Sequence, residues 1–180
     1  LENVAGANKE VVKQTEKYIT KTMLATGVAD DELRPALARL VRSTRDSVKA
    51  QELLNVALDV SKGTGKDLDS VVAALGKAYD GNTNALGKLG LGIDQSLLKS
   101  KDFNKVLDQL KKDFGGFADQ EANTLEGRMK RLSLAVAEAK ESFGAALLPI
   151  LEKLVGFITE KGIPLLNNFL ERWDSIASNI

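Results

Sequence analysis

The sequence predicts an all-α protein in which a small multi-helix module is followed by a long helix that carries coiled-coil heptads. Apolar residues recur at steps of three and four along most of the chain, which places them on one face of a helix. Only 3 of the 180 residues are proline and 5% are aromatic. No stretch sustains the period-two alternation of a β-strand. We expect the module over residues 1–116, and the long helix with a further helix over 117–180.

The first two helices are predicted from apolar stripes and the breaks between them. Residues 9–26 form an amphipathic segment that Gly27 ends. Asp30 or Asp31 is expected to cap the next helix, which holds Pro35 near its first turn, where proline is tolerated. That second helix carries a stripe of Leu33, Leu37, Leu40 and Val41.

Two short amphipathic helices follow, from Gln51 to Val60 and from Leu68 to Tyr79. Gly63 stands where a left-handed C-cap of the first helix would fall, and Asp67 precedes the second as an N-cap candidate. The ends of this helical pair are therefore predicted from local signals alone.

The rest of the module is predicted to be a glycine-rich connection and one further helix. Residues 85–92 contain too many glycines for a long helix, so we expect a single turn followed by a loop. Residues 94–101 fit either a helix or a loop. An amphipathic helix is expected from Phe103 to Phe114, ended by Gly115 and Gly116.

Heptad spacing dominates the chain beyond those two glycines. A helix continuous from Gln120 to Lys161 would be about 60 Å long at about 1.5 Å per residue. Pro149 predicts a kink in this helix, and residues 162–164 predict its stop. The heptad residues predict a surface for self-association or for a partner helix: Leu125, Met129, Leu132, Val136, Ala139, Phe143, Ala146, Ile150 and Phe157.

A second apolar group lies after the predicted stop. Leu165, Leu166, Phe169 and Trp173 belong to a further amphipathic helix. Packing, binding of a partner protein and contact with a membrane surface are the alternatives for this group. Charged residues interrupt the apolar tract before it, so a helix that spans a bilayer is not expected.

Composition excludes several kinds of active site. The chain has no cysteine and no histidine, which removes disulfides, thiol nucleophiles, Cys/His zinc sites and histidine-based triads. Its 25 basic and 25 acidic residues balance, so no sequence-specific nucleic-acid binding is expected. No cofactor, metal site or enzymatic activity is expected either.

The run from Gly63 to Lys66 resembles the end of a phosphate-binding loop but departs from it in two places. Asp67 stands where a serine or threonine would bind magnesium, and Val60 stands where the first glycine is required. A helix also precedes the run in place of a buried strand. A turn between two helices is therefore the favoured interpretation.

An ordered series of segments closely resembles the tape measure proteins of long-tailed bacteriophages and prophages. The series extends from about Thr26 to Leu154, and no single tetrapeptide in it is diagnostic. The segments that carry the resemblance are Glu32 to Leu40, Ala50 to Leu54, Ala57 to Ser61, Gly63 to Leu68, Ala78 to Thr83, Ala85 with Leu86, Leu89 with Gly90, and Gly144 to Leu151.

The resemblance implies a structural role. Tape measure proteins are long, mostly helical chains that lie in the lumen of the tail tube, set its length and leave it when the genome is ejected. It implies parallel copies in a homo-oligomer, a trimer among the options, with tail tube, distal tail and tail tip or baseplate hub proteins as partners. Host membrane contact on ejection is a further option.

The implied location is the virion, in the tail tube lumen or at the tip, and the host cytoplasm during assembly. Family members are much longer, so these 180 residues are expected to be part of a ruler, such as an anchor near one tail end. Two alternatives stay open: a membrane-active helical module, and a helical adaptor that binds partner helices.

Overall fold

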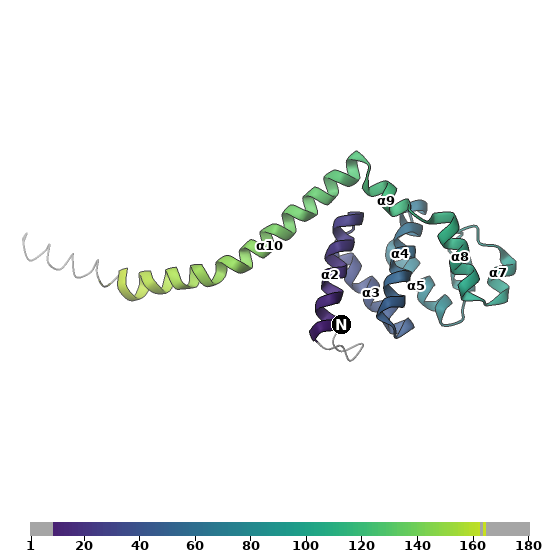
Figure 1. Ribbon diagram of the computed structural model, residues 1–180, viewed down its shortest axis with the longest axis horizontal. Helices are drawn as coiled ribbons and strands as arrows, with labels where there is room; N and C mark the ends of the chain where they lie inside the picture. The colour runs from purple at the N-terminus through teal and green to yellow at the C-terminus, as the bar shows by residue number, and fades with distance from the viewer. Residues whose placement is uncertain (1–8, 163, 165–180) are drawn as a thin grey trace, which may run out of the picture. The chain divides into compact units, whose positions relative to one another are not determined.

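A computed structural model describes residues 9–162 and 164, and these residues form helices and turns without a strand, which confirms the all-α prediction. Figure 1 shows the order of the elements. They are α2 (Lys9–Thr26), α3 (Asp30–Thr44), α4 (Ser47–Thr64), α5 (Leu68–Tyr79), α6 (Asn84–Gly87), α7 (Gln95–Ser100), α8 (Phe103–Phe114), α9 (Phe117–Ala122), α10 (Leu125–Phe157) and a π-helical turn, Ile158–Gly162.

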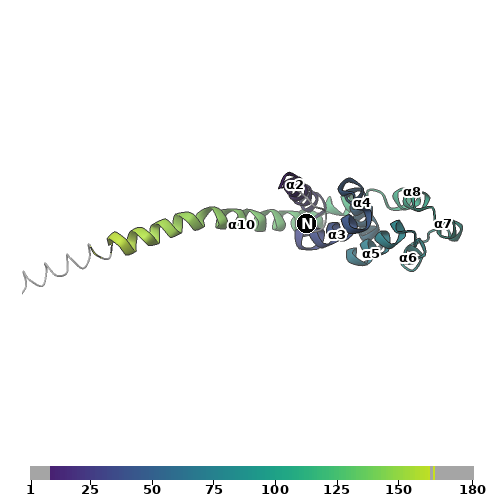
Figure 2. The ribbon, with the colours of Figure 1, turned by 90° about the horizontal axis from the view of Figure 1, so that it is seen from below.

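The chain divides into two compact units, Leu1–Ala135 and Val136–Ile180, and the division falls within α10. In the first unit α4 occupies the centre and contacts α3, α5, α8 and α9. Figure 2 shows α7 at the end of the first unit, next to α6 and α8. The short helix α7 settles residues 94–101, which the sequence left open between helix and loop.

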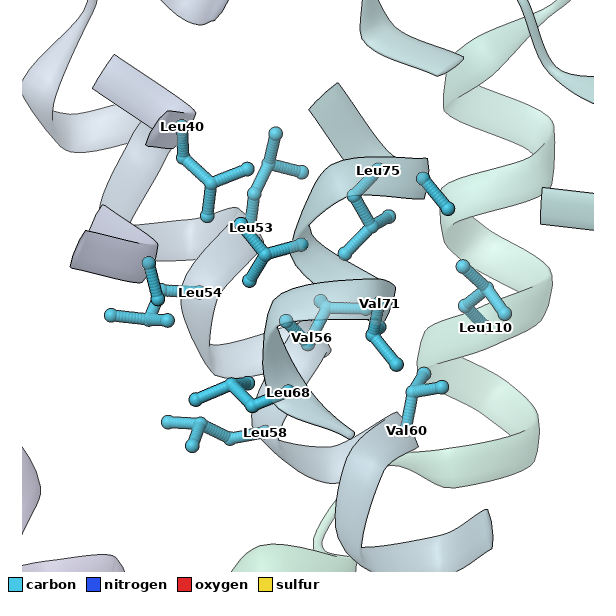
Figure 3. Packing of buried hydrophobic residues seen from close by; sticks show 14 of the residues in the cluster. Leu40, Leu53, Leu54, Val56, Leu58, Val60, Leu68, Val71, Leu75 and Leu110 are labelled. Carbon is cyan, nitrogen blue, oxygen red and sulfur yellow. The ribbon is translucent and has the colours of Figure 1, made fainter. Parts of the chain in front are cut away.

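Leucine side chains from four helices meet around α4 and form the core. Leu40 of α3, Leu53 and Leu54 of α4, Leu75 of α5 and Leu110 of α8 are each at most 1% exposed. Figure 3 shows them converging with neighbouring valines. Burying one such side chain stabilises a fold by about 1.5–3 kcal/mol, so packing on α4 holds these short helices in place.

Aspartates cap four of the helices. The carboxylate of Asp67 accepts a hydrogen bond from the Ser70 backbone N–H at 2.9 Å, as predicted for the start of α5. Asp46, Asp94 and Asp102 cap α4, α7 and α8 in the same manner. Each cap satisfies a backbone donor that the first turn of a helix leaves unpaired.

The predicted cap of α3 was wrong. The N-cap residue is Ala29, which has no side-chain acceptor, and the helix begins at Asp30. Asp30 and Asp31 lie in the first turn, where a carboxylate interacts favourably with the helix dipole. Asp30 also forms an ion pair with Arg34 at 3.0 Å.

The predicted C-cap of α4 was also wrong, because the helix runs on to Thr64 and ends at Gly65. Gly65 has the left-handed backbone, with φ of 67°. Gly63 lies inside the helix, where a Cβ atom would come within 3.1 Å of the rings of Phe114 and Phe117. Gly63 is therefore explained by the close approach of two aromatic side chains, and Gly65 by the turn.

The long helix begins at Leu125, later than the expected start at Gln120. Gln120 lies in α9, a separate short helix packed against α4. The side-chain oxygen of Thr124 accepts a hydrogen bond from the Gly127 backbone N–H at 3.0 Å, which caps the start of α10. The helix continues through Pro149, and the kink expected there stays a prediction.

Candidate functional site

The first turns of α10 contact the helical module through a few residues on one face. Leu134 is partly buried and packs on the core. The guanidinium of Arg131 donates a hydrogen bond to the backbone carbonyl of Ala25 at 3.4 Å, near the C-terminus of α2. A cation at that end of a helix is favourable because the last carbonyls carry partial negative charge.

Gly127 allows the closest contact at the corner between α9 and α10. A Cβ atom at this position would lie 2.2 Å from the carbonyl oxygen of Glu121 and 2.8 Å from the Cα of Ala122. Both neighbours are backbone atoms, which cannot move aside as a flexible side chain would. Gly127, Arg131 and Leu134 follow one another at steps of four and three, and thus share a face of the helix.

The predicted heptad residues in the same turns are exposed. Leu125 is 80% exposed, Met129 60% and Leu132 59%. At about 3.6 residues per turn, these three lie roughly on the opposite side of the helix from Gly127, Arg131 and Leu134. We call the line of predicted heptad residues on α10 the seam. The face with Gly127, Arg131 and Leu134 contacts the module, whereas the seam faces away from it. The seam is therefore open to a partner where α10 meets the module.

In the second unit, α10 carries the other predicted heptad residues. Val136 is 45% exposed, Ala139 is also exposed, and Phe157 is 59% exposed near the end of α10. Phe143, Ala146 and Ile150 have helical backbone, and their side chains lie outside the described part of the chain. The predicted group of Leu165, Leu166, Phe169 and Trp173 lies entirely outside it.

Two polar contacts hold α9 to α4 and so position the corner before α10. A carboxylate oxygen of Asp59 accepts a hydrogen bond from the Ala118 backbone N–H at 3.0 Å. The ammonium of Lys62 forms an ion pair with Glu121 at 2.8 Å. Because α9 has Gly116 as its N-cap residue and no cap of its own, Asp59 supplies the acceptor from another helix.

A third polar contact joins α8 to α4. The carboxylate of Glu52 forms ion pairs with Lys111 of α8 and with Lys49 of its own helix, the latter at 2.8 Å. Hydrogen bonds from Lys111 and Lys49 lower the pKa of Glu52 below its usual value of 4.5. This cluster links α8 to α4 in the scaffold.

The sequence analysis did not single out Gly127, Arg131 or Leu134 as docking residues. The pair Leu132 and Leu134 carried a usable signal, because two leucines two positions apart cannot both lie on one narrow helical face. One of them had to point away from the seam.

No cluster of three or more acidic side chains in the described ranges could hold a metal ion. No helix among the described residues has both the length and the apolar character needed to cross a bilayer. Comparisons with protein families, curated proteins and solved structures found no match.

Proposed function

We propose that this chain is a structural segment of a phage tail tape measure protein, in which the helical module anchors α10 and the seam joins copies of the chain. The observation that supports the proposal is the separation of two faces on α10. One face packs on the module through Leu134, while the seam exposes Leu125, Met129 and Leu132 to solvent.

The physical argument for self-association rests on exposed apolar area. Large side chains that repeat every three or four residues on an exposed helix gain free energy when a second helix covers them. Copies lying parallel along a common axis would then place several modules at one end of the assembly. Such an arrangement suits a chain held in a tube and anchored near its tip.

Sedimentation velocity of the full chain tests the association, with two seam variants and one matched control. We expect Leu132→Glu and Val136→Glu to shift the oligomer toward monomer, because each puts a charge into an apolar interface. Ala137→Glu adds the same charge to the neighbouring exposed residue outside the seam and should leave the oligomer intact. A monomeric wild-type chain, or equal effects of all three variants, would contradict self-association through the seam.

The tail role needs a separate measurement. The full gene's length should match the measured tail length at about 1.5 Å per helical residue. Antibodies against this chain should label the tail axis or tip of purified virions. A short full-length gene, or particles without label, would argue against the ruler.

Two other outcomes favour the alternative functions. Binding of the chain to anionic liposomes, with no label on virions, would favour a membrane-active module. Association with a foreign helix in preference to a second copy would favour an adaptor. The seam is common to these proposals, so the virion experiment distinguishes them.

A further inference from the structure

A row of lysines runs along the outer face of α2. Lys13, Lys17 and Lys21 are exposed and follow one another at steps of four residues. The opposite side of the helix, with Ile19 and Met23, is buried in the core. Four residues of helix rise by about 6 Å, so the ammonium groups stand on one inclined ridge at that repeat.

No carboxylate of the described residues forms an ion pair with any of these three lysines. The nearest acid in the sequence, Glu16, is bound by Arg34 of α3. Like charges four residues apart weaken a helix, so the row does not stabilise α2. Its positive charge is left for something outside the described residues.

The lysines border a wide, shallow depression of about 570 Å³ on the outer surface of α2. Glu16, Thr20 and Leu24 also line it; Arg34 pairs with the Glu16 carboxylate, and Leu24 is 41% exposed. Lysine side chains add their methylene groups to such a surface while the ammonium groups reach water. The face therefore offers apolar contact along its floor and cations along its ridge.

We propose that this face of α2 binds an acidic amphipathic helix of a partner protein. Two helices share the same four-residue rise, so carboxylates at every fourth position of the partner would each meet one ammonium group. The exposed Leu24 adds an apolar contact that an amphipathic helix can use and a phosphate backbone cannot. The partner's apolar residues would rest on Leu24 and Thr20.

Fluorescence anisotropy of a labelled synthetic peptide tests this inference with the full chain. The peptide is helical, with glutamate at every fourth position and leucine along the adjacent stripe. A peptide of the same composition in scrambled order is the first control. We expect the ordered peptide to bind more tightly, and its binding to weaken as salt rises from about 0.05 to 0.5 M, because the pairs are exposed.

The charge-reversal variant K13E/K17E/K21E should weaken binding by about tenfold or more, since three exposed pairs are lost. A peptide with lysine in place of glutamate should then bind that variant in preference to wild type. The matched control K77E/K99E/K112E reverses three exposed lysines on other helices and should bind like wild type. The milder variant Lys17→Gln, expected to weaken binding about threefold, serves if the triple variant unfolds.

Several results would overturn the inference. Equal loss of affinity in the two triple variants would indicate attraction by total charge alone. Equal binding of the ordered and scrambled peptides would show that the four-residue repeat does not contribute to the affinity. Tighter binding of duplex DNA than of the ordered peptide would show that the lysine row binds a phosphate backbone in preference to an acidic helix.

Discussion

Asp59 of α4 caps α9, a helix to which it does not belong, by accepting a hydrogen bond from the Ala118 backbone N–H at 3.0 Å. The chain between them includes all of α5, α6, α7 and α8. The position of α9 therefore depends on a tertiary contact with α4. Since α10 follows α9 directly, the same contact sets where the seam begins.

Asp59→Ala should destabilise the first unit by about 1 kcal/mol, as loss of an N-cap usually does. Urea unfolding followed by circular dichroism measures this change, and hydrogen exchange should show faster exchange in α9 than elsewhere. Asp59→Asn keeps an acceptor oxygen and should lose less. The exposed Asp108→Ala is the control and should stay within about 0.5 kcal/mol of wild type. Unchanged exchange in α9 of Asp59→Ala would contradict the capping role.

Gly127→Ala should be destabilising, because its Cβ would overlap the Glu121 carbonyl oxygen and force the corner between α9 and α10 to open. Overpacking of this kind typically costs about 1–3 kcal/mol. Gly144→Ala makes the same chemical change inside α10, with no atom within 4 Å of the new Cβ. It should raise helicity, because alanine is favoured over glycine by about 1 kcal/mol in a helix. Shifts of the unfolding temperature in opposite directions for the two variants would support the close approach at Gly127. Shifts in the same direction would refute it.

The sequence predicted the bounds of α2, α5 and α8 because the apolar stripe and the capping residues of each helix lie together in the chain. It predicted α4 too short, from Gln51 to Val60, and it did not predict α9. The helices α2 and α8 have the bounds expected for them, and α5 begins after its predicted cap, Asp67. Local signals failed where the cause was distant. Gly63 was assigned to a turn because the rings of Phe114 and Phe117, which explain it, come from other elements.

The candidate site was also predicted only where the signal is local in the sequence. The exposed seam follows from spacing within one helix, and its described members Leu125 and Met129 are exposed as a partner surface requires. Leu134 and Gly127 owe their roles to tertiary contacts with the module and α9. No periodicity within α10 specifies those contacts, so sequence reasoning could not assign them.

Protonation of Glu52 should make the first unit slightly less stable in acid. Its pKa is lowered in the folded state, and in the unfolded chain it should lie near 4.5. The stabilisation is present above about pH 4.5 and is lost as the pH falls through the folded-state pKa. Glu52 is 37% exposed, so solvent screening keeps the effect below about 1 kcal/mol. Glu52→Gln should flatten this acid dependence in urea unfolding measured over the same pH range.

Ionisation of Tyr18 should make the first unit less stable at alkaline pH. Its hydroxyl lies 2.9 Å from the Asn55 side-chain oxygen and 3.1 Å from the Gln51 carbonyl oxygen, and its single proton is shared between these two acceptors, which joins α2 to α4. Burial raises the pKa of Tyr18 above its usual value of 10.0, because desolvation disfavours the phenolate. The unfolded chain therefore loses this proton first, and stability declines as the pH rises from about 10 through the folded-state pKa.

Tyr18→Phe tests this link between α2 and α4. At neutral pH the variant should lose about 1 kcal/mol, the usual contribution of such a hydrogen bond. Above about pH 10 its stability should fall less steeply than that of wild type, and subtracting the two curves removes the titration of lysines common to both. Tyr79→Phe, at the other tyrosine of the chain, is the control for the substitution. Parallel curves for wild type and Tyr18→Phe would show that the phenol of Tyr18 titrates alike in the folded and unfolded states.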